Sequence, residues 1–280
     1  MCLAFFLFDV HPLYSMLVAS NRDEYYSRPA LPAHFWEDEP DVFAGRDKEA
    51  GGTWFGISRG GRMALITNFR EMTTVAGAPS RGDLTLNFLR SPAGTSPMQY
   101  LQSVIASQKV YNGYNLVVAD LHSKQAAYLT NRGDPSQAGP RQLAPGIYGL
   151  SNAVLDSPWP KLELGKSSLQ TMLNKSSGEP LSLKLIVDQV LCDMSTVEDA
   201  HLPETGAPLE VEKALMSAFV NTTFPKGRYG TSTQTVMAAR RDGIVEWHER
   251  FLDTCGASQA WQETDHQINL RSEHCVEKAA

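Results

Sequence analysis

Cys2 directly follows Met1 and begins an apolar run that continues to Phe8. If Met1 is removed, as is usual in cells before a small residue, Cys2 carries a thiol and a free α-amino group on one carbon. The thiolate is the nucleophilic form of cysteine, and an α-amino group with a pKa of about 7.7–8.0 can accept the thiol proton near pH 7. Although a cysteine in a strand is more often a small buried hydrophobe, Cys2 is therefore a candidate nucleophile with its own base.

A second polar cluster, Asn21-Arg22-Asp23-Glu24, follows the apolar stretch YSMLVAS. One interpretation is a turn with surface ion pairs, which would carry little stability. The other depends on the short connection through His11 and Pro12. If the two apolar runs pair as antiparallel strands, the end of the second returns beside Cys2. Arg22 would then favour the thiolate, and Asp23 could hold the α-amino group by a hydrogen bond.

The elements expected to position these residues come as groups of strands followed by groups of helices, and not as a strict β-α-β alternation. Antiparallel sheets with helices packed outside fit this order better than a doubly wound parallel sheet. Residues 53–58 and 63–69 flank Arg59-Gly60-Gly61-Arg62, which predicts a hairpin. The other predicted strands are residues 2–8, 14–20, 114–121, 126–130, 147–151, 234–239 and 244–248, and the predicted helices are residues 83–89, 98–110, 162–173 and 181–194.

Other motifs in the chain favour no second chemistry. Residues 56–60 match the G-x-S-x-G nucleophile motif, but that motif needs a strand turning into a helix, and here an apolar strand pattern follows. The seven histidines include no H-x-x-x-H pair, and His274-Cys275 lies in a polar stretch, so no metal site is predicted. The chain contains neither the G-x-G-x-x-G nor the G-x-x-x-x-G-K-[ST] phosphate-binding loop.

Composition narrows the class of protein. The chain has 280 residues, 42% hydrophobic and 20% charged, which is typical of a globular protein. A net charge of −6 and a pI near 5.7 argue against a nucleic-acid or anionic membrane surface as partner. We expect no signal peptide and no membrane span, and scattered cysteines that are free thiols. The expected location is the cytoplasm, with the mitochondrion as the alternative.

Motifs along nearly the whole chain carry a resemblance to a known family. The chain resembles the transport and Golgi organisation 2 family, also called the NRDE family, and through it the N-terminal nucleophile (Ntn) hydrolases. The resemblance implies an α+β fold, an αββα sandwich of two antiparallel sheets covered by helices. We expect one domain over residues 1–280 with a polar tail from about residue 265. The matching stretches are MCLAFFLFD, ASNRDEYYSRP, EAGGTWFGIS, LITNFRE, SRGDL, YNGYNLVVADL, GIYGLSNAVLDSPWPKL, LPETG, YGTSTQTV and HERF.

The same resemblance implies roles for individual residues. Cysteine members of the fold, such as penicillin V acylases and bile salt hydrolases, match Cys2, Arg22 and Asp23, with Asn152 of LSN as a further catalytic position. Most family members carry an arginine after YGT, where this chain has Ser232. The predicted substrate-binding residues lie in the matching stretches and are Asn21, Trp54, Asn68 and Asn115, with Phe55 beside Trp54 as part of an apolar wall.

Two functions remain open from the sequence. The first is hydrolysis of a linear amide or acyl bond through Cys2, which requires no cofactor. The second is a non-catalytic protein that binds or traffics haem or an acyl-lipid, because the family is associated with haem trafficking and with lipid and acyl-CoA metabolism. In that case haem is a ligand, and Cys2, His34 or a methionine is a candidate axial ligand. The predicted partner is therefore a small-molecule amide, an acyl-lipid or haem.

Overall fold

Two seven-stranded antiparallel sheets form the centre of the computed structural model, which describes residues 2–134, 139–253 and 260–271. In spatial order, the first sheet contains β10 (Gly146–Leu150), β1 (Cys2–Phe8), β2 (Tyr14–Tyr25), β12 (Gly227–Arg240), β13 (Ile244–Leu252) and β14 (Trp261–Asn269), with β11 (Asn221–Phe224) paired to β12. The second contains β3 (Ala30–Phe35), β4 (Val42–Asp47), β5 (Phe55–Ser58), β6 (Arg62–Asn68), β7 (Tyr114–Asp120), β8 (Gln125–Thr130) and β9 (Arg141–Gln142).

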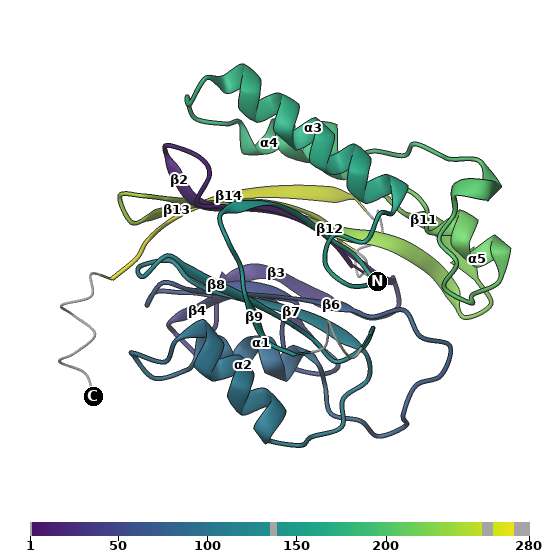
Figure 1. The fold of residues 1–280 in the computed structure, drawn as a ribbon, viewed down its shortest axis with the longest axis horizontal. Helices are drawn as coiled ribbons and strands as arrows, with labels where there is room; N and C mark the ends of the chain where they lie inside the picture. The colour runs from purple at the N-terminus through teal and green to yellow at the C-terminus, as the bar shows by residue number, and fades with distance from the viewer. Residues whose placement is uncertain (1, 135–138, 254–259, 272–280) are drawn as a thin grey trace.

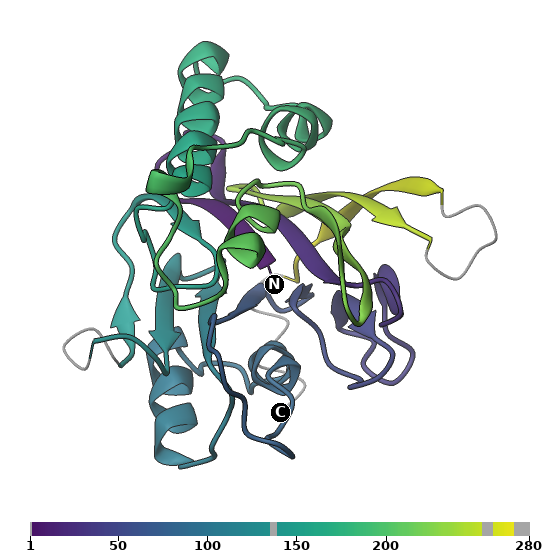
Figure 2. The same cartoon turned by 90° about the vertical axis from the view of Figure 1, so that its right-hand side faces the viewer.

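Helices cover the outer face of each sheet (Figures 1 and 2). The first sheet is covered by α3 (Pro160–Ser176), α4 (Leu183–Ile186) and the π-helical turn η1 (Val187–Leu191) that continues α4. The second sheet is covered by α1 (Gly82–Leu89) and α2 (Pro97–Ala106). The short η2 (Asp199–His201) and α5 (Leu209–Ala214) lie in the connection between η1 and β11. The layers are therefore α, β, β and α, which confirms the predicted fold class.

Strand β1 is buried on both faces, which explains its unbroken apolar sequence. Phe6 and Phe8 pack into the core between the two sheets, whereas Phe5 and Leu7 pack under the helices of the first sheet. Each such side chain contributes about 1.5–3 kcal/mol by leaving water. Gly165 lies over Phe5, and a Cβ at this glycine would come within 2.0 Å of the Phe5 ring. The glycine in α3 is therefore what lets the helix approach the sheet.

Several sequence predictions need correction. The NRDE residues belong to β2 and lie in the interior of the sheet rather than in a turn. The helix predicted at residues 98–110 ends at Ala106, and the one at 181–194 is divided into α4 and η1. Residues 265–269, placed in the polar tail, are the end of β14, whose mostly polar sequence conceals the strand. The strands β3, β4, β9, β11 and β14 were not predicted.

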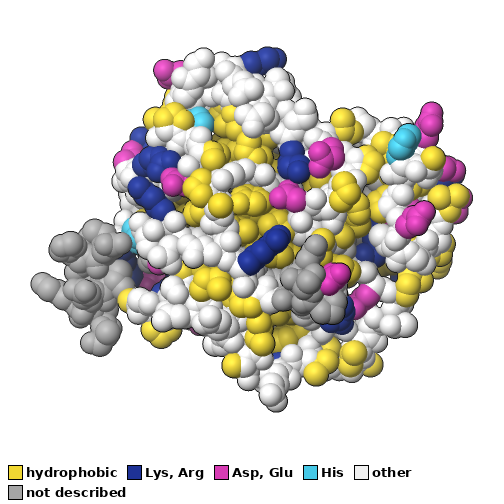
Figure 3. Space-filling model, viewed as in Figure 1, with side chains coloured by type: hydrophobic (Ala, Val, Ile, Leu, Met, Phe, Trp, Pro, Cys, Tyr) yellow, Lys and Arg dark blue, Asp and Glu magenta, His cyan; other side chains and the backbone are white. Residues whose placement is uncertain are grey.

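The hairpin β5–β6 is present as predicted, with a positive φ at Gly61, so residues 56–60 do not form a strand-to-helix nucleophile turn. Within the described part of the chain, no helix is long and apolar enough to cross a membrane. On the face shown in Figure 3, basic and acidic side chains are interspersed, with hydrophobic side chains visible between them. His274 and Cys275 lie outside the described residues.

Candidate active site

The pairing of β1 with β2 brings the two polar clusters of the sequence together. Cys2 is directly opposite Arg22, and β12 pairs with the other edge of β2, so that Arg22 is opposite Thr233. Arg22 faces the second sheet, where it meets Asp47 and Trp54. Because side chains alternate along a strand, Asn21 and Asp23 lie on the opposite face, although Asp23, unlike Asn21, also lines the cavity that contains Cys2. The site is therefore divided between the two faces of one strand.

Cys2 lines a cavity of about 340 Å³ that opens between the two sheets. Only 9% of the residue is exposed, and this burial raises the pKa of the thiol. The negative charge of Asp23 acts in the same direction, whereas Arg22 and a hydrogen bond from the backbone N–H of Asp23 act against it. The thiol is thus predominantly protonated at neutral pH and needs a base to become a nucleophile.

Arg22 is held by groups from three different strands and loops. Its Nη1 donates to Ser232 Oγ at 3.1 Å, its Nη2 lies 3.5 Å from Asp47 Oδ2, and its Cζ lies 4.7 Å from the centre of the Trp54 ring. Ser232 lies at an irregularity in the β2–β12 register, between Thr231 and Thr233. Bulges of this kind redirect side chains beside functional sites. At this irregularity Ser232 accepts a hydrogen bond from Arg22.

Asp23 is buried against β12 on the helical side of the sheet. Its Oδ1 accepts a hydrogen bond of 2.7 Å from Thr231 Oγ1, and its carbonyl oxygen accepts one of 3.0 Å from the Tyr229 hydroxyl. Burial raises the pKa of the Asp23 carboxyl, and the positive charge of Lys161, the Thr231 bond and Arg22 oppose that rise. The hydrogen bond from Thr231 holds the carboxyl in position.

Lys161 is a charged group of this site that the sequence analysis did not single out. It lies in the first turn of α3, is buried, and donates from Nζ to the carbonyl oxygen of Leu215 at 2.9 Å. Burial lowers its pKa to about 8, with the charge of Asp23 acting in the opposite direction. The only signal in the sequence was its place in the matching stretch PWPKL. A lysine in a helical pattern is normally interpreted as solvent-exposed.

Asn68, predicted to bind substrate, and Asn152, predicted to be catalytic, occupy different places. Asn68, at the end of β6, lines the cavity. Asn152 is buried behind it, and its Nδ2 donates to the carbonyl oxygen of Asn68 at 2.7 Å. The carbonyl oxygen of Asn152 accepts a hydrogen bond from the backbone N–H of Arg70. Asn152 thus contacts the backbone on which Asn68 is carried.

Asn21 and Asn115 are buried in hydrogen-bond networks and do not line the cavity. Asn21 Nδ2 donates to the carbonyl oxygens of Leu191 and Ala218, each at 2.9 Å. Asn115 accepts from the Tyr128 hydroxyl at 2.7 Å and donates to the carbonyl oxygen of Ala153 at 3.0 Å. These contacts give both residues structural partners, in the helical layer and beside Asn152 respectively.

Of the two aromatic residues predicted as an apolar wall, only Trp54 lies at the cavity. Trp54 lines the cavity, and Gly45 of β4 makes room for it, because a Cβ there would lie 2.5 Å from the ring. Phe55 instead stacks on Trp247 inside the core. Arg81, at the amino end of α1, also lines the cavity, and its charge interacts with that of Cys2. It lies in the matching stretch SRGDL, but no role was predicted for it.

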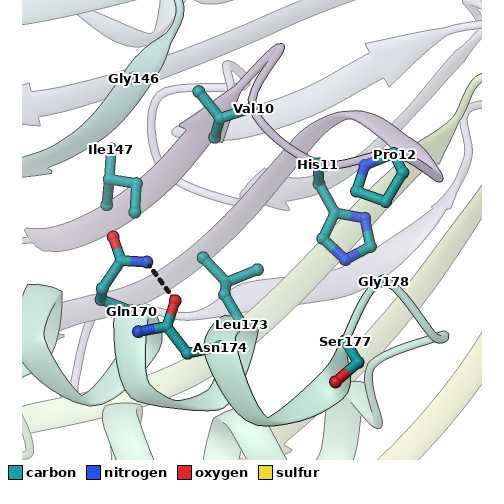
Figure 4. A pocket seen from close by; sticks show the side chains of 10 residues that line it. All are labelled: Val10, His11, Pro12, Gly146, Ile147, Gln170, Leu173, Asn174, Ser177 and Gly178. Atoms are coloured by element: carbon teal, nitrogen blue, oxygen red, sulfur yellow. Dashed lines mark hydrogen bonds between the residues drawn. The ribbon is translucent and has the colours of Figure 1, made fainter.

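A wider hollow of about 600 Å³ lies at the opposite end of β1 (Figure 4). It is bordered by His11 in the β1–β2 turn and by the carboxyl end of α3, where Gln170 Nε2 donates to Asn174 Oδ1 at 2.9 Å. None of the residues predicted from the sequence as a site lines this hollow.

Solved structures of known proteins share the fold. A C2A mutant of the conjugated bile acid hydrolase from Clostridium perfringens matches with a TM-score of 0.51 and 9% identity, over 98% of this chain and 94% of that one. Another variant of the same hydrolase matches with a TM-score of 0.50 and 9% identity, over 98% of this chain and 99% of that one. The chain therefore has an Ntn-hydrolase-like fold.

Sequence comparisons give the family. The model of the family described as "Transport and Golgi organisation 2" matches residues 1–254. The Transport and Golgi organization protein 2 homologs of Bos taurus and Homo sapiens are 36% and 34% identical, each over 97% of this chain and 100% of the relative. The Drosophila melanogaster Transport and Golgi organization protein 2 is 24% identical over 94% of this chain and 96% of its own. The chain belongs to the transport and Golgi organisation 2 family.

Proposed function

We propose that this protein hydrolyses a linear amide or acyl bond through Cys2. The observation that carries the proposal is the position of the Cys2 thiol in a cavity, opposite Arg22 and hydrogen-bonded by the backbone of Asp23. The likeness in fold to a hydrolase, the conjugated bile acid hydrolase, adds support. The mechanism requires removal of Met1, which frees the α-amino group of Cys2.

In the proposed reaction, the α-amino group takes the thiol proton and Sγ attacks the carbonyl carbon of the substrate. The tetrahedral intermediate collapses when the bond to the leaving group breaks, and the ammonium returns the proton to that group. Water then attacks the thioester, giving the carboxylic acid and restoring the thiol. Asp23 holds the ammonium, and Arg22 favours the thiolate.

The oxyanion of that intermediate needs hydrogen-bond donors aimed at it, which contribute several kcal/mol in enzymes of this kind (about 2.7–4 per donor). We assign this role to the side chain of Asn68, supported by its place in the cavity lining. Asn152 acts with it as a positioning residue, because its amide holds the Asn68 carbonyl. Trp54 supplies the apolar surface for the acyl group.

Mass spectrometry of the intact protein tests the proposal directly. The protein purified from its native cell should lack Met1, and incubation with a panel of N-acyl amides and acyl thioesters should give hydrolysis with a transient acyl adduct on Cys2. Cys2→Ser should lose at least about 100-fold in rate, since it replaces the nucleophile. Cys192→Ser is the matched control, because Cys192 contacts Gln234 outside the cavity. Retention of Met1, or an adduct on another thiol, would refute the mechanism.

A second candidate is a protein that binds haem or an acyl-lipid without turnover. It is favoured by Ser232, which stands in this chain where the family resemblance leads us to expect an arginine. Cys2 is the predicted haem ligand that lines the cavity, whereas His34 of β3 contacts the carbonyl oxygen of Pro32. Titration with haem separates the candidates. A Soret shift that Cys2→Ser abolishes, together with no turnover on the substrate panel, would favour the carrier.

A further inference from the structure

The cavity around Cys2 is lined by three arginines, and two of them share a carboxylate. Arg22 Nη2 lies 3.5 Å from Asp47 Oδ2, and Arg28 Nε lies 2.7 Å from the same oxygen. Burial disfavours ionisation of Asp47, but the hydrogen bonds from Arg28 and from the backbone N–H of Ala50 lower its pKa overall. Asp47 is thus a carboxylate, and it balances much of the charge of Arg22 and Arg28.

Arg81, the third arginine, has a different environment. Its Nη1 donates to the carbonyl oxygen of Gly113 at 2.9 Å. Among the residues that the structure describes, no Asp or Glu forms an ion pair with it. Burial lowers its pKa, and the negative charge that Cys2 carries when its thiol is ionised is the strongest influence in the opposite direction. A guanidinium keeps its proton in proteins, so Arg81 brings an uncompensated positive charge to the cavity.

Glu71 and Glu24 are the two carboxylates whose charges act on the pKa of Arg81, and both have other partners. Glu71 Oε2 pairs with Arg132 Nε at 2.8 Å, and Glu71 Oε1 accepts a hydrogen bond from the backbone N–H of Gly113 at 2.7 Å. Glu24, which also lines the cavity, accepts a hydrogen bond from the backbone N–H of Tyr25 at 2.8 Å. Neither carboxylate therefore neutralises Arg81 by direct contact.

The position of Arg81 is fixed before any ligand binds. Gly113, which accepts its hydrogen bond, is packed so closely that a Cβ there would lie 2.8 Å from Phe69 Cβ. On the other side, Arg81 is followed by Gly82, which packs against the backbone of Thr53 at the cavity wall. A charge that is already oriented binds an anion without the entropic cost of ordering a flexible side chain.

We propose that Arg81 binds a carboxylate of the substrate, so that the protein acts on acyl compounds that carry an anionic group close to the reacting carbonyl. One of the five N–H donors of the guanidinium bonds Gly113, and the others include a two-donor edge that matches a carboxylate. This inference rests on the proposed function, because the bound anion is a substrate only if the protein is a hydrolase. Selection of an anion at Arg81 can nevertheless be measured without turnover.

The test compares paired alkylating reagents on Cys2, with the rates followed by peptide mass spectrometry. Iodoacetate and iodoacetamide differ in one carboxylate, and 3-maleimidopropionate and its amide form a longer pair. In the folded wild type, the anionic-to-neutral rate ratio at Cys2 should be about tenfold or more above the ratio for the same chain unfolded in urea, as expected for one charged hydrogen bond. Because both reagents of a pair need the same thiolate, the ratio cancels effects on the thiol itself.

Arg81→Gln should return this ratio at Cys2 to about that of the unfolded chain. Arg141→Gln removes an equal charge from an exposed arginine of β9 outside the cavity and should leave the ratio unchanged. If Arg81→Gln does not fold, the wild-type ratios with and without urea still test for an anion site in this cavity, and equal ratios overturn the proposal. Equal ratios in folded and unfolded chains for both reagent pairs, or a ratio that Arg81→Gln does not change, would overturn the proposal.

The results separate this inference from the proposed function. Anion selection that depends on Arg81, combined with no hydrolysis of any substrate, supports the anion site and refutes the hydrolase. Hydrolysis without anion selection refutes the site and leaves the hydrolase standing.

Discussion

Cys2 and Arg22 are paired residues of the antiparallel ladder between β1 and β2, and both face the cavity between the two sheets. Arg22 is in turn held by Ser232 and Asp47. The candidate nucleophile and its cation thus lie on adjacent interior strands of a seven-stranded sheet. Sites carried by central strands are positioned more precisely than sites on loops.

The pH dependence of Cys2 alkylation should show the balance of charges around the thiol. Burial raises the Cys2 pKa, so the rate with iodoacetamide should keep rising with pH beyond the range of an ordinary thiol. Arg22 lowers this pKa, so Arg22→Gln should move the midpoint to still higher pH. Arg46→Gln, at a surface pair with Asp38, is the control. A midpoint that falls in Arg22→Gln would contradict this electrostatic account.

Lys161 should make stability depend on alkaline pH. Its pKa is about 8 in the folded protein and 10.5 ordinarily, so the unfolded chain binds more protons between these values. Stability should therefore rise with pH across this window, by up to about 3 kcal/mol from this group. Lys161→Met should lack that rise. Urea unfolding of both proteins near pH 7 and near pH 10 measures the difference. An equal dependence of stability on pH in the two proteins would show that folding does not lower the pKa of Lys161.

Glu249 should have the opposite effect in the acidic range. It lies in the core, where it accepts hydrogen bonds from the backbone N–H of Ala33 and from Trp247 Nε1, and burial raises its pKa to about 7. The folded protein binds more protons between the ordinary value of 4.5 and about 7, so stability from this group is present below that window and lost as pH rises through it.

Glu249→Gln removes this titration. The stability of the variant relative to wild type should increase by up to about 3 kcal/mol between pH 4.5 and pH 8. The comparison uses urea midpoints of both proteins at the two pH values, with Glu246→Gln on the same strand as the control. A stability difference that does not change with pH would exclude Glu249 as a buried titrating group.

Gly165→Ala should destabilise the protein by about 1–3 kcal/mol, because the new methyl group would overlap the Phe5 ring. This outcome opposes the usual gain from replacing glycine by alanine within a helix. Ser167→Ala, on an exposed position of the same helix, controls for helix propensity. Thermal melting measures both variants, and an increase in Tm for Gly165→Ala would mean that α3 does not press on β1 as closely as described.

How much could be predicted from the sequence depends on how local the contact is. The meeting of Cys2 with Arg22 was predictable, because a short connection between two apolar runs favours antiparallel pairing, and pairing determines which residues are opposite each other. The αββα arrangement followed from block-wise strands and helices together with the family resemblance. Strands with partly exposed, polar sequences, such as β14, were missed because their hydrophobic alternation is weak.

The orientation of the polar residues was decided only by the tertiary structure. Adjacent residues of a strand point to opposite faces, so Arg22 faces the cavity while Asn21 bonds the helical layer, although both belong to the same motif. Lys161 and Arg81 reach the site from α3 and the start of α1, elements far from Cys2 in the chain. Which face of a helix or strand is turned inward depends on the packing of all layers at once. The sequence thus determined the ladder and its residue pairs, and packing alone determined which side chains share the cavity.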